Sequence, residues 1–297
     1  MTSDDGNQQM VVDDGSAGGV GSSVRLASNG TVTSFFTATA VSLDAFVRTN
    51  SSGTINVSVV EVTSTAAGTP LLRTADTNEP RLEYDASGQP LGLLIEEQRT
   101  NNLGYSEGFA TGWNSPSFCN ATPNATLTPD GTVSGTKLQE DNSGTGGPRF
   151  FPTVNAVITA SQAQTISCFF KANTSSYSYL TIRHSNNNVA CVEYNLTNGT
   201  INSTNAVGNM TINNSDIVSV GNGWYRCSLT ATCSGTTSSG FYFIGLSNGS
   251  GVNDAGYPDY TLTGKNIYAW GAQVEQGSFP TSYIPTSGST VTRTGDA

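Results

Sequence analysis

Short segments in which apolar and polar residues alternate dominate the chain, and Gly- and Asn-rich turns separate them. Beyond residue 103 these segments cover residues 163–171, 179–183, 189–196, 224–232, 241–246 and 266–275. Because successive side chains of a strand point to opposite faces, a period of two residues predicts strands rather than amphipathic helices. No segment has a convincing helical period, and no repeat of fixed length runs through the sequence. Several short strands at this spacing are typical of a sandwich or a barrel.

The first hundred residues carry different signals. The acidic, glycine-rich start predicts an extended flexible arm, and alternation at residues 55–59 predicts a small β region for docking or oligomerisation. Pro80 and Pro90 indicate an extended linker, because proline is excluded from helices and central strands.

We therefore divide the chain into four segments: the arm over 1–30, the small β region over 31–77, the linker over 78–104 and the sandwich over 105–297. The predicted fold class is all-β. It is a jelly-roll-type antiparallel β-sandwich with an extended N-terminal arm and a small N-terminal β region.

The charge balance excludes several classes of partner. The chain has 12 basic and 22 acidic residues, a net charge of −10, and only 11% of its residues are charged. A chain this acidic is repelled by nucleic-acid phosphates and by anionic membranes. No apolar run reaches the roughly 20 residues that span a bilayer, and the start of the chain lacks the basic and apolar regions of a secretory signal. We therefore expect no nucleic-acid binding and no membrane insertion.

The five cysteines are an odd number and include no C-x-x-C pair, which disfavours a disulfide framework and a zinc site. Several lie in apolar strand-like runs, and Cys227 shares a strand face with Tyr225 and Leu229. We favour reduced thiols that are buried as small hydrophobic residues, which suits a protein made in a bacterial cytoplasm. The cysteines are Cys119, Cys168, Cys191, Cys227 and Cys233.

Signatures of catalysis are weak. The single histidine, His184, lies at the expected end of a strand, and no G-x-S-x-G elbow accompanies it. Carboxylates such as Glu193, Glu275, Asp254 and Asp259 can be paired on paper for glycoside hydrolysis, but spacing in a β-sandwich confirms no pair. We assign no catalytic residue and predict that the chain is not an enzyme.

A set of motifs in the last two thirds of the chain resembles one family. The motifs are PRLEYD at 80–85, GLLIEEQRTN at 92–101, YSEGF at 105–109, NGWYR at 222–226, AWGAQVE at 269–275, TSYIPT at 281–286 and VTRT at 291–294. In this order they resemble bacteriophage tail-fibre and virion proteins that carry a carbohydrate-binding-module-like β-sandwich. The resemblance covers about residues 78–297, and Asn102 and Gly104 depart from it by replacing apolar residues. Residues 1–75 show no such match, and we expect them to determine where the protein docks.

Part of these motifs has a physical interpretation. Arg99 can pair with Glu96 or Glu97 to hold the linker against the sandwich. The whole of residues 94–101 has no such explanation, and we interpret it as a structural hinge. Alternation along residues 266–275 predicts that four side chains share one face and line the sandwich core: Tyr268, Trp270, Ala272 and Val274.

The resemblance implies glycan binding, because sandwich modules of this type stack sugar rings on exposed aromatic side chains. The candidates are Trp113, Tyr177, Tyr179, Tyr257 and Tyr260. For each of them, packing inside the protein is the competing interpretation.

Some related sandwiches also hold a structural calcium ion, which requires hard oxygen ligands. The candidate ligands are Asp130, Glu140 and Asp141. We expect no other cofactor.

The resemblance implies a virion protein that is made in the host bacterial cytoplasm and displayed on the virion surface. A short arm, one sandwich and no fibre shaft favour a capsid decoration (cement) protein or head fibre that docks to the major capsid protein through its N-terminal region. The alternative is a receptor-binding tail fibre or spike that docks to tail proteins and adheres to host polysaccharide. A glycan depolymerase is the third possibility. Virion proteins of this kind are often oligomers, and we expect a homo-oligomer, specifically a trimer.

Overall fold

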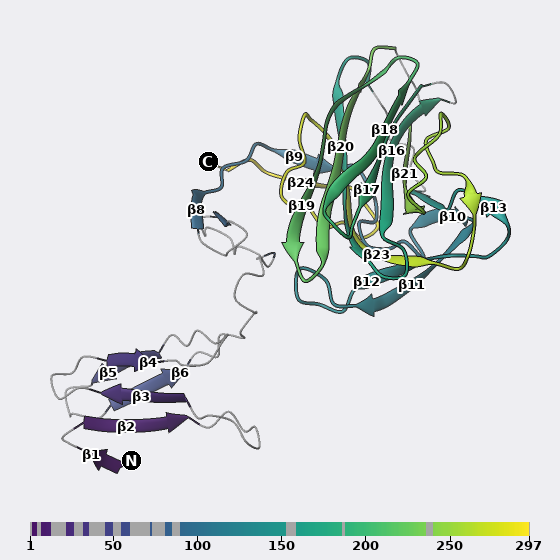
Figure 1. The fold of residues 1–297 in the computed structure, drawn as a ribbon. Helices are drawn as coiled ribbons and strands as arrows, with labels where there is room; N and C mark the ends of the chain where they lie inside the picture. The colour runs from purple at the N-terminus through teal and green to yellow at the C-terminus, as the bar shows by residue number, and fades with distance from the viewer. Residues whose placement is uncertain are drawn as a thin grey trace. The chain divides into compact units, whose positions relative to one another are not determined.

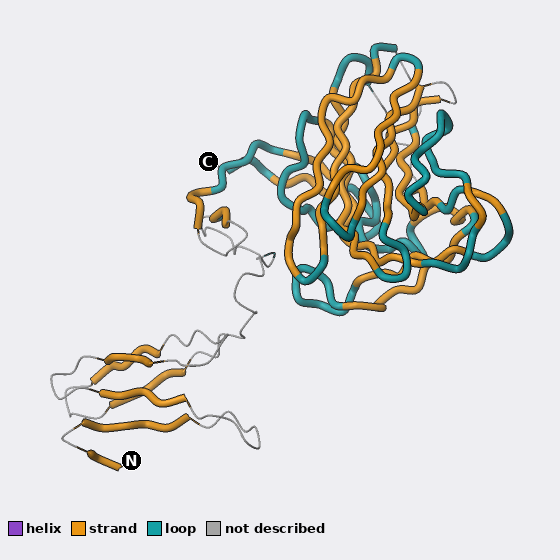
Figure 2. Tube along the Cα trace, viewed as in Figure 1, coloured by secondary structure: helices purple, strands orange, loops and turns teal. Residues whose placement is uncertain are grey.

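The structure is a computed structural model, and it describes most of the chain beyond residue 90 and parts of the chain before it. The described residues are 2–4, 7–12, 22–26, 32–35, 45–49, 55–59, 72, 81–84, 90–152, 159–185, 188–235 and 240–296. The chain forms two compact units, residues 1–69 and residues 70–297. Over the described residues the regular structure is strand alone (Figure 2), so the predicted all-β class is confirmed.

The first unit contains two antiparallel sheets. One has four strands in the order β1-β2-β3-β4, and the other is the hairpin of β5 and β6. The strands are β1 (Thr2–Asp4), β2 (Asn7–Val12), β3 (Ser22–Leu26), β4 (Val32–Phe35), β5 (Ala45–Thr49) and β6 (Ile55–Val59). The strand expected at residues 55–59 is therefore present.

The prediction of an extended arm over residues 1–30 differs from the structure, because strands β1, β2 and β3 lie within this range. Strand β3 pairs with β2 on one side and with β4 on the other. Its sequence alternates between polar and apolar residues, with Val24 and Leu26 two positions apart. This strand signal follows the glycine-rich stretch at residues 15–21, which favours an extended arm.

The second unit is an antiparallel β-sandwich of two six-stranded sheets (Figure 1). The first sheet has the order β10-β14-β21-β16-β17-β18, and the second sheet has the order β11-β12-β23-β15-β20-β19. The first sheet contains β10 (Trp113–Ser117), β14 (Arg149–Pro152), β16 (Tyr177–Ser185), β17 (Asn188–Asn195), β18 (Thr200–Val207) and β21 (Phe241–Ser247). The second contains β11 (Cys119–Thr126), β12 (Gly135–Glu140), β15 (Ala163–Ala172), β19 (Met210–Gly221), β20 (Trp224–Cys233) and β23 (Asn266–Gln276). The chain crosses repeatedly between the two sheets, as the predicted jelly-roll-type sandwich requires.

Three short antiparallel pairs accompany the sandwich. They are β13 (Thr145–Gly146) with β22 (Tyr260–Thr261), β7 (Leu82–Tyr84) with β8 (Pro90–Leu93), and β9 (Arg99–Asn101) with β24 (Val291–Arg293). Strands β7, β8 and β9 lie in the segment that sequence analysis treated as an extended linker, and β24 lies near the C-terminus.

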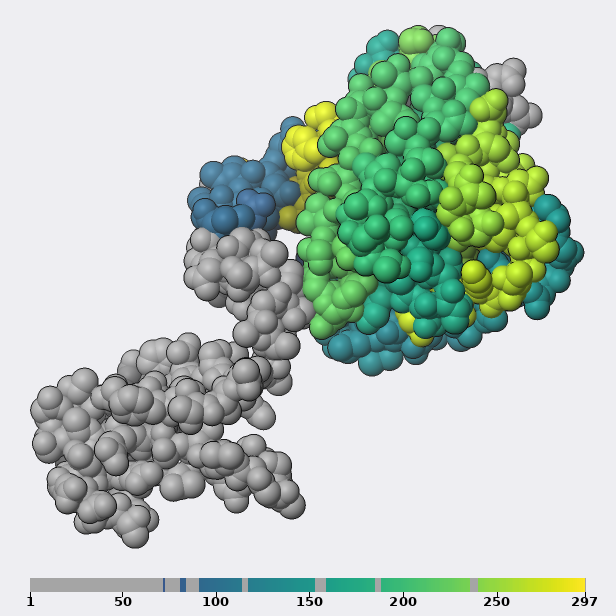
Figure 3. Space-filling model, viewed as in Figure 1, coloured from purple at the N-terminus to yellow at the C-terminus, as the bar shows by residue number. Residues whose placement is uncertain are grey.

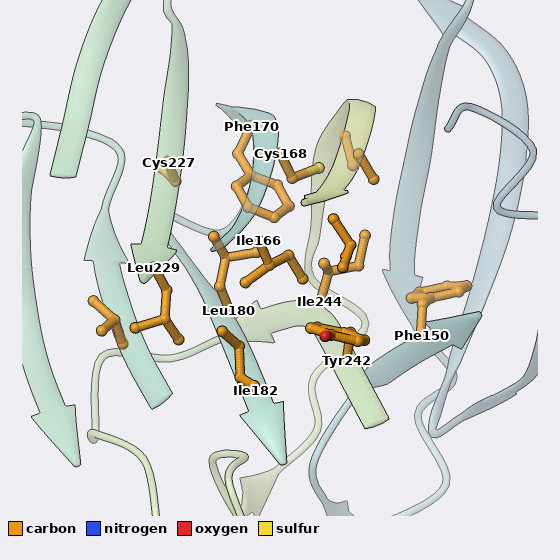
Figure 4. Packing of buried hydrophobic residues seen from close by; sticks show 14 of the residues in the cluster. Phe150, Ile166, Cys168, Phe170, Leu180, Ile182, Cys227, Leu229, Tyr242 and Ile244 are labelled. Atoms are coloured by element: carbon orange, nitrogen blue, oxygen red, sulfur yellow. The ribbon is translucent and has the colours of Figure 1, made fainter. Parts of the chain in front are cut away.

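The sandwich core lies between the two sheets. Side chains from both sheets interdigitate there, among them Ile166 and Phe170 of β15 and Leu180 and Ile182 of β16 (Figure 4). All five cysteines are free and buried, as predicted, and Cys227 and Leu229 lie in the core. Burial raises the pKa of the Cys168 thiol, so this thiol stays protonated and behaves as a small hydrophobic residue.

A β-bulge in β23 overturns the predicted face of Trp270. The pairing of β15 with β23 gains one residue on β23 between Trp270 and Gln273, and Gly271 adopts a φ of 60°. An extra residue reverses the alternation beyond it. Before the bulge, Tyr268 and Trp270 therefore point away from the core; after it, Ala272 and Val274 point into the core. The sequence pattern assumed unbroken alternation and placed all four on one face.

We predict that Gly271→Ala destabilises the second unit. A Cβ at this position would lie 2.9 Å from Phe169 Cδ2, and the backbone is in the left-handed region. Strain of this kind costs about 1–3 kcal/mol, and each kcal/mol lowers the melting temperature of a domain this size by roughly 2–4 °C. Gly104→Ala is the matched control, since its Cβ would come no closer than 3.9 Å to any atom. Equal melting temperatures for the two variants would contradict the role of the bulge.

Candidate functional site

The motifs that are distant in sequence meet on the outer face of the second sheet, the face turned away from the core. Trp224 of NGWYR, Trp270 of AWGAQVE and Phe169 of β15 form a buried aromatic cluster. Tyr283 of TSYIPT packs over it, with its ring centroid 4.7 Å from that of Trp270 and 6.1 Å from that of Phe169. The indole N–H of Trp224 donates to the carbonyl oxygen of Leu127 at 3.0 Å. Aromatic burial therefore holds the segment after β23 onto this face.

Asn101, the last residue of GLLIEEQRTN, connects three segments through its buried side-chain amide. Its Nδ2 donates to the carbonyl oxygens of Ile284 at 2.9 Å and Ala272 at 3.3 Å. Its Oδ1 accepts from the backbone N–H groups of Val274 at 3.1 Å and Leu103 at 3.2 Å. Both donors and both acceptor positions of the amide are thus satisfied inside the protein.

Side chains of β20 and β23 hold the TSYIPT segment on the sheet through hydrogen bonds. Gln273 accepts from the backbone N–H of Ile284 at 2.7 Å and donates to the carbonyl oxygen of Thr281 at 3.3 Å. The buried carboxylate of Glu275 accepts from the Thr281 backbone N–H at 3.0 Å and from the Thr281 hydroxyl. Arg226 donates to the carbonyl oxygen of Thr281 at 2.6 Å. Burial lowers the pKa of Arg226, and the charge of Glu275 opposes that effect.

A charged cluster fastens the incoming linker beside residues 291–296. Glu96 accepts from Arg81 at 2.6 Å and from Arg293 at 2.8 Å, and its other oxygen accepts from the backbone N–H of Ser282 at 2.8 Å. Arg81 also pairs with Asp296. The cluster balances two cations against two carboxylates. Burial alone would raise the pKa of Glu96, but the hydrogen bonds from Ser282 and Arg81 and the charge of Arg293 outweigh it and leave this pKa below its ordinary value.

Arg99 adds a further contact between the linker and β23. It pairs with Glu97 at 2.5 Å, one of the two partners that sequence analysis proposed, and donates to the carbonyl oxygen of Gln276. Its guanidinium lies where a Cβ of Gly277 would be and sits 5.2 Å from the ring centroid of Phe279. A polar pocket of about 250 Å³ opens here, lined by Gln98, Arg99, Thr100, Asn102 and Gln276.

Together these contacts define what we call the anchor: Arg81, Glu96, Arg99, Asn101, Arg293 and Asp296. Residues 94–101 were interpreted as a hinge, but the structure shows the second half of this stretch built into the sandwich through β9 and β24. Sequence analysis did not identify Arg81, Asn101, Arg293 or Asp296 as functional. For Arg81 and Arg293 the available signal was the concentration of charged residues in motifs of a chain that is only 11% charged; Asn101 is uncharged, and Asp296 lies outside the motifs.

Three of the five predicted glycan-binding aromatics are buried. Trp113 packs against Phe109 at 5.0 Å between ring centroids and donates to the carbonyl oxygen of Tyr105. Tyr179 has no exposed surface, and Tyr260 donates to the buried carboxylate of Glu140. These rings present no face to solvent, so sugar stacking on Trp113, Tyr179 and Tyr260 is not supported. Packing, the competing interpretation, accounts for all three.

Tyr177 and Tyr257 remain partly exposed, and both lie over the outer face of the first sheet. Residues 248–259 cover part of this face: Gly256 contacts Thr181, whose hydroxyl donates to the Gly256 carbonyl oxygen. The guanidinium of Arg149 lies 4.3 Å from the ring centroid of Tyr257 and occupies one side of that ring. Gly249 packs against the ring of Tyr177, since a Cβ added there would lie 2.7 Å from Tyr177 Cζ, so both rings are partly covered.

The proposed calcium ligands serve as hydrogen-bond acceptors within the protein. Asp130 accepts from the backbone N–H of Thr132 at 3.0 Å, and Asp141 accepts from that of Ser143 at 2.9 Å. Glu140 accepts from the Tyr260 hydroxyl at 2.7 Å and from the backbone N–H groups of Thr263 and Lys265. Among the residues that the structure describes, no three His, Cys, Asp or Glu side chains are grouped to hold a metal ion. The structure thus gives each of these carboxylates a hydrogen-bond donor within the protein and does not gather the three as one set of ligands.

The residues considered for catalysis also have structural partners. Glu193 is buried and accepts from the Ser247 hydroxyl, the Asn202 amide and the backbone N–H of Gly251. Asp254 accepts from Asn205 at 3.0 Å. His184, at the end of β16, lies 3.4 Å from the amide of Asn188. Each of these contacts stabilises a loop or strand end.

Comparison with known proteins adds no relative. No protein-family model matches the chain, and no curated protein matches it. In the described part of the structure, no helix has the length and apolar character needed to cross a membrane.

We predict that Glu96→Gln weakens the anchor more than Glu97→Gln. Glu96 is only 10% exposed, and loss of its charge leaves Arg293 without its carboxylate and Arg81 with Asp296 alone, at a cost of about 1–3 kcal/mol. Glu97 is 59% exposed, and such a pair contributes about 0–1 kcal/mol. Thermal unfolding of both variants at neutral pH measures the difference. A Glu97→Gln effect as large as that of Glu96→Gln would contradict the anchor geometry.

The loss of melting temperature caused by Glu96→Gln should disappear in acid. Because the folded-state pKa of Glu96 lies below its ordinary value of 4.5, its carboxylate stabilises the fold above that pH. The stabilisation is lost as the pH falls below 4.5 and through the folded-state pKa. The difference in melting temperature between wild type and Glu96→Gln should therefore be full at pH 7 and shrink progressively below pH 4.5. A difference that stays constant into acid would show that charge at Glu96 is irrelevant.

Proposed function

We propose that the chain is a structural protein of a bacteriophage virion, displayed on the particle surface as a capsid decoration protein or head fibre. The observation that carries this proposal is the anchor. The motifs that resemble virion proteins lie far apart in sequence, yet their side chains converge on one structural task. That task is to fasten the incoming chain to a β-sandwich.

The anchor suits display because it fixes where the chain enters the sandwich. In the space-filling view the blue linker residues lie against the yellow residues near the C-terminus (Figure 3), in agreement with the pairing of β9 and β24. The linker and the last described residues thus occupy one side of the sandwich.

In this proposal the first unit, residues 1–69, docks to the major capsid protein, and the sandwich is the exposed part. Solubility then depends on polar uncharged residues, since only 11% of the chain is charged. The acidic character of the chain, with a net charge of −10, supports a role outside the packaged nucleic acid.

Immunogold electron microscopy of phage particles that encode this chain tests the proposal, with antibody raised against residues 105–297. We expect label distributed over the head. Label confined to the tail would contradict capsid decoration and support the tail-fibre alternative. No label on particles that contain the chain by mass spectrometry would contradict surface display.

One observation favours the second candidate, a receptor-binding tail fibre or spike that adheres to host polysaccharide. The partly exposed Tyr177 lies on the outer face of the first sheet, beside the loop that begins at Ser247. An aromatic ring at the rim of a sheet face can stack on a sugar ring.

If the chain is an adhesin, the purified protein should block phage adsorption to host cells, and Tyr177→Ala should reduce that competition at least tenfold. Val218→Ala, a change of an exposed residue on β19, serves as the control. A decoration protein should not compete for the receptor, so absence of competition by the wild-type protein would contradict this second candidate.

A further inference from the structure

The polar pocket beside the anchor opens where β9 meets the end of β23. Its volume is about 250 Å³, and every side chain that lines it is polar: Gln98, Arg99, Thr100, Asn102 and Gln276. It is smaller than the sites of about 300–1,000 Å³ that hold drug-sized molecules, so it suits a ligand of about one ring. The kind of ligand then depends on the hydrogen bonds and the charge that the pocket walls offer.

Two side-chain amides of the pocket have no hydrogen-bond partner in the protein. In the part of the chain that the structure describes, no group donates to or accepts from the side-chain amide of Gln98 or of Asn102. Gln276 adds an acceptor, because its Nε2 donates to Gln162 and its own Oε1 receives no hydrogen bond. A side-chain amide offers two N–H donors and a carbonyl acceptor in one plane. It can therefore donate to one hydroxyl group of a ligand and accept from the next.

The backbone around the pocket is fixed, so a ligand has to order side chains only. Thr100 pairs with Thr292 across β9 and β24, and their hydroxyl oxygens lie 2.8 Å apart. The backbone N–H of Asn102 donates to the carbonyl oxygen of Val274 at 2.7 Å. Gln276 is the last residue of β23, which pairs with the central strand β15. Walls that are built on strands lower the entropic cost of binding.

The charge within the pocket is balanced, which disfavours an anionic ligand. Arg99 is the charged residue of the lining, and the carboxylate of Glu97 lies 2.5 Å from its guanidinium. Arg99 also donates to the carbonyl oxygen of Gln276. A phosphate or carboxylate would have to compete with Glu97 for the same donors, in a chain whose net charge is −10. A neutral ligand meets no such competition.

An exposed aromatic ring lies next to the pocket. Phe279 is 45% exposed, and its ring centroid lies 5.2 Å from the Arg99 guanidinium. A sugar ring carries hydroxyl groups at its edge and C–H groups on its face, so it can use the polar lining and the apolar ring together. A metal ion or an acyl chain would use only one of the two.

We propose that this pocket binds one unit of a neutral saccharide. The side-chain amides of Gln98 and Asn102 and the Oε1 of Gln276 hold its hydroxyl groups, and Phe279 lies beside its ring. The five aromatic residues that sequence analysis selected for glycan binding take no part in this site. The inference goes beyond the proposed function, because it holds whether the chain is carried on the head or on the tail.

Saturation-transfer NMR of the full chain with the methyl glycosides of glucose, galactose, mannose and N-acetylglucosamine tests this inference. We expect at least one of them to bind with a dissociation constant of about 1–10 mM, as is usual for so small a ligand. Asn102→Leu should raise that constant about tenfold, since it removes the hydrogen bonds of one amide, and Gln98→Ala should act in the same direction. Asn120→Leu, the same change at an exposed residue of β11, is the matched control and should bind as the wild type does.

Three results would overturn the inference. The first is absence of saturation transfer to all four glycosides at concentrations well above the expected dissociation constant, which would mean that water alone satisfies the amides. The second is an unchanged dissociation constant in Asn102→Leu, which would place binding elsewhere on the protein. The third is tighter binding of methyl glucuronide than of methyl glucoside, weakened by salt, which would indicate an anion site at Arg99. The melting temperature of Asn102→Leu should match that of the wild type, because the backbone hydrogen bond to Val274 remains.

Discussion

The buried amide of Asn101 is the interaction on which the arrangement of the second unit depends. It is completely enclosed and makes four hydrogen bonds, to the linker, to β23 and to the segment around Ile284. An amide of this kind stabilises only one geometry, because any displacement leaves buried donors or acceptors unsatisfied. The charged cluster around Glu96 extends the same junction towards the surface. Residues 99–102 are consequently part of the sandwich.

This junction explains why the motifs are separated in sequence. Each contributes one side of it: GLLIEEQRTN supplies the amide and the central carboxylate, AWGAQVE supplies Gln273 and Glu275, and TSYIPT supplies the covering segment. A sandwich held in this way can be carried by a separate unit without losing its orientation to the linker. That property suits the proposed display on a particle surface.

The pattern of the sequence predicted much of the fold, and particular residues show where the prediction failed. Alternation predicted the strands, the antiparallel sandwich and the buried Cys227, because burial of one face fixes the period. A strict period of two residues does not allow for the bulge at Gly271, so Trp270 was assigned to the wrong face. Tyr179 and Trp113 could not be identified as buried from residue type alone, because aromatic residues occur both in cores and on binding surfaces. The anchor requires long-range pairs such as Arg81 with Asp296, for which local sequence holds no signal.

Native-state hydrogen exchange tests the central claim, that residues 99–102 are built into the sandwich. The backbone N–H of Asn102 donates to the Val274 carbonyl oxygen at 2.7 Å, and the N–H of Val274 donates to Asn101. We expect both amides to exchange as slowly as those of the central strand β15, through global unfolding of the unit. Exchange of the Asn102 amide at the rate of an open linker, while β15 stays protected, would show that the junction opens on its own and would contradict the account.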